Sequence, residues 1–88
     1  MENEDFMNEG MEERARYFEQ QLASGESFFY DNDELGQLID YYLDFEQIHL
    51  ATKAIAFGES LYPFETNYKI KKAEVYIVQR NINDAVKL

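Results

Sequence analysis

Hydrophobic residues recur at intervals of three and four along most of the chain, which is the spacing of one face of an α-helix. The first such segment covers about residues 11–23 and ends at Gly25, a residue suited to the left-handed conformation of a helix cap. A second segment follows Asp31, which with Glu34 three residues later is typical of a helix N-terminus. Its apolar positions are Leu35, Leu38, Ile39 and Tyr42.

The pattern then predicts three further helices. One covers residues 48–61 and stops before Pro63, the only proline, and the next covers about residues 66–80. We expect a turn at residues 81–83 and a fifth helix that starts at Ile82 or Asn83 and is truncated at Leu88. Residues 1–9 are polar and acidic, so we expect them to fray. The sequence therefore predicts an all-α fold of about five helices in antiparallel hairpins.

The helix predicted at residues 48–61 is poor in side-chain volume. Ala51, Ala54, Ala56 and Gly58 lie within eight residues of one another. Glycine inside a helix costs roughly 1 kcal/mol relative to alanine, so Gly58 indicates a place where a side chain would collide with a neighbour. We expect the small residues to let this helix approach the preceding one closely.

A repeat is visible within the helical pattern. Ile48 and Ala51 recur as Ile82 and Ala85, an offset of 34 residues (82 minus 48), and the same offset carries Tyr42 onto Tyr76. Helix–turn–helix units of about 34 residues are the period of the tetratricopeptide repeat. Residues 32–63 resemble that family in the spacing of Leu35, Leu38, Ile39, Tyr42, Ala51, Ile55, Gly58, Leu61 and Pro63. The second unit departs from the pattern, since Lys69 and Lys72 replace large apolar residues.

The resemblance implies an organisation of the chain into stacked hairpins that form a right-handed superhelix. Residues 1–29 would be an acidic tail and a non-repeat capping helix, 30–64 a first repeat and 65–88 a partial second repeat, all in one structural domain. The unfinished second unit would leave its C-terminal face uncovered. We expect the natural chain to continue beyond Leu88, with self-association through that face as the alternative.

The amino-acid composition limits the kinds of partner and the cellular location that we expect. The net charge is −10, and 14 of the 18 acids precede residue 47, so a nucleic-acid partner is disfavoured. The chain lacks cysteine, and its apolar runs are too short to span a membrane. An acidic N-terminus without a basic leader favours a soluble cytoplasmic protein.

The family resemblance also implies a function, which is to hold a peptide or a helix of a partner protein along an inner wall of first helices. The positions carried across are Asp33, Gly36, Asp40, Leu43, Asp44, Asn67, Ile70, Glu74, Ile77 and Val78. Because Asp40 and Glu74 would repel an anionic tail, we expect a basic or amphipathic partner segment.

Other chemistry finds little support in the sequence. His49 is the only histidine and has no partner at ligand spacing, so we expect no metal, no cofactor and no catalysis. Lys69, Lys71 and Lys72 fit a solvated helix face better than an anion site. One alternative function remains open, an acidic regulator that masks a basic surface of a partner. It would need Glu12, Glu13, Asp31, Asp33 and Asp40 in one patch.

Overall fold

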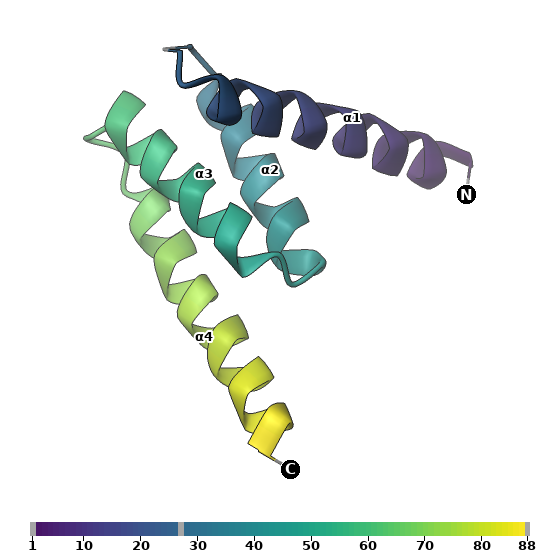
Figure 1. Cartoon of the computed structure of the whole chain (residues 1–88), viewed down its shortest axis with the longest axis vertical. Helices are drawn as coiled ribbons and strands as arrows, with labels where there is room; N and C mark the ends of the chain where they lie inside the picture. The colour runs from purple at the N-terminus through teal and green to yellow at the C-terminus, as the bar shows by residue number, and fades with distance from the viewer. Residues whose placement is uncertain (1, 27, 88) are drawn as a thin grey trace. The chain divides into compact units, whose positions relative to one another are not determined.

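The structure, a computed structural model, describes residues 2–26 and 28–87. Over these residues it contains α-helices and no β-strand, in agreement with the predicted fold class. The helices are α1 (Glu2–Ser24), α2 (Asn32–Asp44), α3 (Ile48–Leu61) and α4 (Asn67–Lys87), coloured in chain order in Figure 1. The described residues thus form four helices, and the prediction of five is wrong.

The chain divides into two compact units, Met1–Tyr30 and Asp31–Leu88. In the first unit, α1 ends at Ser24 and Gly25 follows with a φ of 72°, the left-handed conformation predicted for this glycine. The buried Phe18 ring meets Phe28 and Tyr30 edge-on, with centroid separations of 5.9 Å and 5.5 Å. These aromatic contacts join α1 to the segment that follows it.

The start of α1 differs from the prediction. Residues 2–9 were expected to fray, but their backbone continues the helix without interruption. This segment contains neither proline nor glycine, and carboxylates near a helix N-terminus interact favourably with the helix dipole. Polarity alone was therefore a poor indicator of where the helix begins.

In the second unit, α2 and α3 form the predicted antiparallel hairpin. Asp31 caps α2: its Oδ2 accepts hydrogen bonds from the backbone N–H groups of Asp33 (3.0 Å) and Glu34 (3.3 Å). At the other end the backbone N–H of Gln47 donates to the carbonyl of Tyr42 (2.7 Å), and Glu46 adopts a positive φ of 58°. One residue in the left-handed region is enough to reverse the chain between the two helices.

The interface of the hairpin contains the residues that the periodicity predicted. Tyr42 is 1% exposed, and Ala51 and Ala54 are completely buried. Small side chains on α3 allow its backbone to approach large side chains on the neighbouring helices, which is how helices pack at short axial distance. The buried residues of α2 and α3 are Leu35, Leu38, Ile39, Tyr42, Leu43, Ala51, Ala54, Ile55 and Gly58.

Helix α3 packs against both α2 and α4, whereas α2 and α4 share a smaller contact. Gly58 lies at the α3–α4 interface. A Cβ atom on this residue would fall 2.5 Å from Cζ and 2.9 Å from Oη of Tyr68, closer than non-bonded atoms can come. The predicted collision is therefore real, but the neighbour is a ring on α4 and not the helix that precedes α3.

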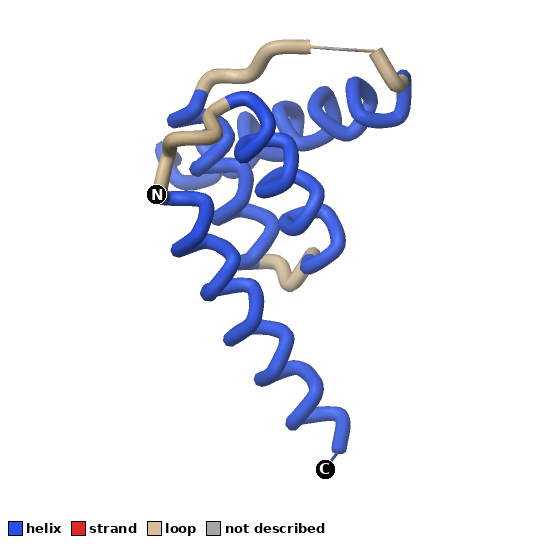
Figure 2. The backbone as a smooth tube through the Cα atoms, turned by 90° about the vertical axis from the view of Figure 1, so that its left-hand side faces the viewer, coloured by secondary structure: helices blue, strands red, loops and turns tan. Residues whose placement is uncertain are grey.

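Helix α4 is a single uninterrupted helix of 21 residues, and Figure 2 shows that it runs past the α2–α3 turn. The predicted turn at residues 81–83 and the fifth helix are absent. No glycine or proline occurs there, and asparagine disfavours a helix only mildly. Partly buried positions continue in helical register along Lys71, Val75, Val78 and Ile82, so the apolar side of α4 needs no break. The 34-residue offset had matched the middle of one helix to the start of another.

Candidate functional site

Part of the predicted inner wall lines one concave surface of the second unit. Asp33, Gly36 and Asp40 on α2 face Ile70 and Asn67 on α4 across a cavity of about 440 Å³. We call this the α2/α4 groove. Its lining residues are Asn32, Asp33, Gly36, Gln37, Asp40, Asn67, Tyr68, Ile70 and Lys71. The three α2 positions meet because a spacing of three and four residues places them on one side of a helix.

The other predicted inner-wall residues lie elsewhere. Leu43, Asp44 and Val78 line a separate cavity of about 580 Å³ at the α2–α3 turn, where α4 passes it. Ile77 is 61% exposed on α4, and Glu74 lies beside Lys71. The predicted set is therefore divided between different parts of the surface and does not form one continuous wall.

Lys71 changes the charge of the α2/α4 groove, and no pattern in the sequence indicated that it lies there. Its Nζ donates a hydrogen bond to Asp40 Oδ1 (2.5 Å) and lies 4.0 Å from Glu74 Oε2. The Lys71 side chain is only 19% exposed. Asp40 is thus paired within the protein and has less charge to offer a ligand than the sequence suggested. Asp33, which forms no ion pair within the described residues, is the more available carboxylate.

The lysines of α4 do not share one solvated face. Lys71 reaches α2, whereas Lys72 Nζ lies 2.9 Å from Glu59 Oε1 on α3. Consecutive residues point about 100° apart around a helix axis, so neighbours in sequence can bind different helices. Each of these ion pairs has one partner more than half exposed, and such pairs contribute little to stability, but they orient the side chains at the edges of two grooves.

A partly buried hydrogen-bond chain includes two lining residues of the α2/α4 groove, Asn32 and Tyr68. Tyr68, 2% exposed, donates from its hydroxyl to Asn32 Oδ1 (2.6 Å), and Asn32 Nδ2 donates to Glu65 Oε2 (3.4 Å). Burial, with smaller contributions from Tyr62, Glu65 and Asp31, raises the pKa of Tyr68 to about 12. The sequence analysis missed Tyr68. Gly58 was the only signal, because it implied a bulky neighbour.

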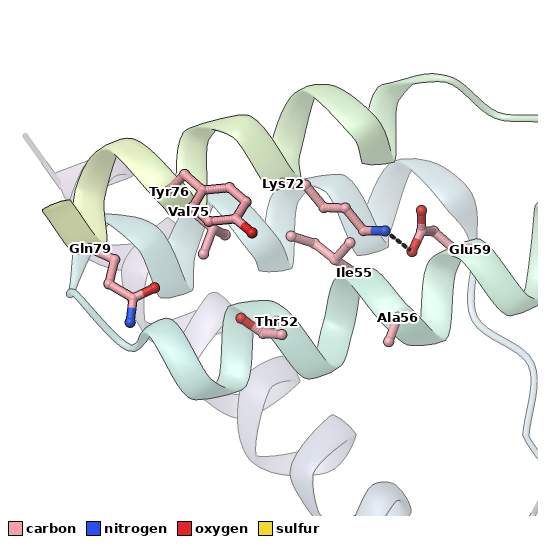
Figure 3. A pocket seen from close by; sticks show the side chains of 8 residues that line it. All are labelled: Thr52, Ile55, Ala56, Glu59, Lys72, Val75, Tyr76 and Gln79. Atoms are coloured by element: carbon pink, nitrogen blue, oxygen red, sulfur yellow. Dashed lines mark ion pairs between the residues drawn. The ribbon is translucent and has the colours of Figure 1, made fainter.

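A second groove lies between α3 and α4, with a volume of about 420 Å³ (Figure 3). We call this the α3/α4 groove. Its lining residues are Thr52, Ile55, Ala56, Glu59, Lys72, Val75, Tyr76 and Gln79. The Lys72–Glu59 ion pair spans one end, and Tyr76 lies over the groove from α4 while remaining 76% exposed. The sequence analysis placed no site here.

The described residues offer no metal centre. No group of three or more His, Cys, Asp or Glu side chains among them could hold an ion, and His49 is exposed. None of the helices in this part of the chain combines the length and apolar character that crossing a bilayer requires. The acids of the alternative hypothesis are divided between units, with Glu12 and Glu13 in the first and the remaining three in the second.

No protein-family model matches the chain, and comparison with curated proteins and with solved structures also gives no match.

Proposed function

We propose that the second unit is a protein-binding module without catalysis of its own, built on a hairpin that resembles a single tetratricopeptide repeat. Its α2/α4 groove would hold a peptide or helix of a partner protein. The observation that carries this proposal is that Asp33, Gly36, Asp40 and Ile70, chosen from the repeat pattern alone, line one groove.

The packing of the hairpin supports the resemblance. Its buried signature residues in α2 and α3 are Leu35, Leu38, Ile39, Tyr42, Ala51, Ile55 and Gly58. Helix α3 ends immediately before the loop that contains Pro63. The proposal covers one hairpin followed by α4. It does not include a second hairpin, because α4 continues where the second turn was expected.

The side chains that line the α2/α4 groove indicate the kind of peptide segment that it would accept. Gly36 leaves open space in its wall, since a Cβ atom there would meet nothing within 4 Å. Ile70 is 57% exposed and offers apolar contact, while Asp33 offers an exposed carboxylate. A short segment with one apolar side chain and an adjacent lysine or arginine complements these groups.

The test uses the full chain and a synthetic amphipathic peptide made of lysine, alanine and leucine. We expect titration to shift the backbone amide NMR signals of Asp33, Gly36, Asn67 and Ile70. The Gly36→Gln variant should weaken binding about tenfold, because the new side chain would occupy the groove and its Cβ atom would meet nothing within 4 Å.

Gly10→Gln is the matched control, since Gly10 is also a helical glycine with nothing within 4 Å and lies in the first unit. Equal affinities for the parent, Gly36→Gln and Gly10→Gln proteins would refute the proposed site. Amide shifts confined to residues outside the groove would refute it as well.

A further inference from the structure

The α3/α4 groove carries an aromatic side chain that the fold does not use. Tyr76 is 76% exposed although it lies midway along α4, over the side of the groove that Val75 and Ile55 line. Exposed tyrosine beside an apolar depression is characteristic of binding surfaces, because a large ring gains much contact area for little lost entropy.

The α3 side of the groove, opposite Tyr76, has small side chains. Thr52 and Ala56 on α3 carry small side chains, and the Thr52 hydroxyl already donates to the carbonyl of Ile48 (2.9 Å). No polar group on this wall therefore requires a partner from a ligand. Small residues along one helix allow the backbone of another helix to approach closely.

Exposed basic residues flank Tyr76 along α4, with Lys72 in the wall of the α3/α4 groove and Lys69 and Arg80 beyond its lining residues. Lys69, Lys72, Ala73, Tyr76 and Arg80 are all exposed, and their spacing of three or four residues places them on one side of the helix. Among the described residues that line the groove, Glu59 is the only acid, and Lys72 already pairs with it. Lys69, Lys72 and Arg80 thus give this side of α4 three basic residues in a chain with net charge −10, with the exposed Asp84 one turn beyond Arg80.

We propose that the α3/α4 groove is a second protein-binding site, which accepts an acidic amphipathic helix of a partner protein. An apolar side chain of that helix would pack on Tyr76 and Ala56, and flanking carboxylates would meet Lys69 and Arg80. The Lys72–Glu59 pair stays intact and marks one end of the site. This site is separate from the α2/α4 groove and prefers the opposite charge, so it stands whether or not the proposed function is correct.

The probes are two synthetic amphipathic helical peptides with the same alanine and leucine positions, one with glutamate and one with lysine at the polar positions. We expect the glutamate peptide to shift the amide signals of Thr52, Ala56, Val75, Tyr76 and Gln79 in the full chain. Its affinity should fall at least threefold between about 50 and about 300 mM salt, because exposed charges are screened.

Substitutions in the α3/α4 groove and at control positions distinguish loss of a peptide contact from a general effect on the protein. Tyr76→Ser should weaken the glutamate peptide about tenfold, since it removes a central aromatic anchor. The matched control is Phe64→Ser, which removes an aromatic residue that is 96% exposed in the α3–α4 loop. Arg80→Glu should also weaken binding, whereas the charge reversal Arg16→Glu in the first unit should not.

Four outcomes would overturn this second site. They are the absence of shifts with the glutamate peptide, equal shifts with the lysine peptide, the same shifts with a single-stranded RNA oligonucleotide, and equal weakening by Tyr76→Ser and Phe64→Ser. Sedimentation of the chain alone provides a further check. A dimer that Tyr76→Ser dissociates would make a second copy the occupant and overturn the assignment to an acidic partner helix.

Discussion

Two helical glycines are expected to respond to the same substitution in opposite directions. At Gly58, alanine would place Cβ against the Tyr68 ring, 2.5 Å from Cζ. The atoms that this Cβ would meet lie at the far end of the Tyr68 side chain. In an open site such a side chain could move aside. Here the ring is 2% exposed and its hydroxyl is bound to Asn32, so relief of the clash requires α4 to shift or the hydrogen bond to break. At Gly36, alanine would meet nothing within 4 Å.

The magnitudes follow from these contacts. Overpacking costs about 1–3 kcal/mol and a broken hydrogen bond about 1 kcal/mol, against a gain of about 1 kcal/mol from replacing glycine in a helix. We therefore expect Gly58→Ala to lower the free energy of unfolding by about 1–3 kcal/mol. Gly36→Ala should raise it by about 0.5–1 kcal/mol, through helix propensity alone.

Urea unfolding followed by far-ultraviolet circular dichroism measures both changes. The slope of the free energy of unfolding against urea concentration should stay unchanged if the denatured state is unaffected. The coupling to Tyr68 can be isolated in a double-mutant cycle. Gly58→Ala should cost less in a Tyr68→Leu background, because the ring that it strikes is gone. Two results would refute the contact between Gly58 and Tyr68. One is that Gly58→Ala and Gly36→Ala change the free energy of unfolding in the same direction, and the other is that Gly58→Ala destabilises the Tyr68→Leu protein as much as the parent.

The remaining predictions concern Tyr68, the turn and α4. The folded protein raises the pKa of Tyr68 from 10.0 to about 12, so stability attributable to this group is complete below pH 10 and is lost as the pH rises toward 12. In urea melts over this range, the parent should lose about 2–3 kcal/mol relative to Tyr68→Phe, and parallel pH profiles would contradict the burial of this hydroxyl. Glu46→Gly should raise the midpoint of thermal unfolding, since relief of the left-handed strain is worth about 0.5–1 kcal/mol after the entropy of glycine is counted. If α4 is continuous, Asn81→Ala should stabilise the protein by about 0.5 kcal/mol and Asn81→Gly should destabilise it slightly, whereas a turn at that residue would favour glycine.

The sequence predicted the α2–α3 hairpin well because its signals are local. Asp31 and Glu34 mark the start of α2, Pro63 lies just beyond α3, and the spacing of Leu38 and Tyr42 identifies the face that becomes buried. Each of these features acts within a few residues of its own position. Periodicity, capping and helix termination can therefore be recognised without knowledge of the tertiary structure.

What the sequence missed depends on contacts between distant residues. The Lys71–Asp40 and Tyr68–Asn32 pairs join residues more than 30 positions apart, and no local pattern indicates them. The continuous α4 was missed for a different reason. We expected a turn from an internal match in sequence, although the segment contained neither glycine nor proline, the residues that most strongly interrupt a helix.

Adjacent lysines hold α4 from two sides, Lys71 through Asp40 on α2 and Lys72 through Glu59 on α3. A rotation of α4 about its own axis in either direction would lengthen at least one of these ion pairs. The same rotation would move Ile70 in one groove and Tyr76 in the other, because both side chains are carried by one rigid helix. A ligand that turned α4 from one groove would therefore also alter the shape of the other groove.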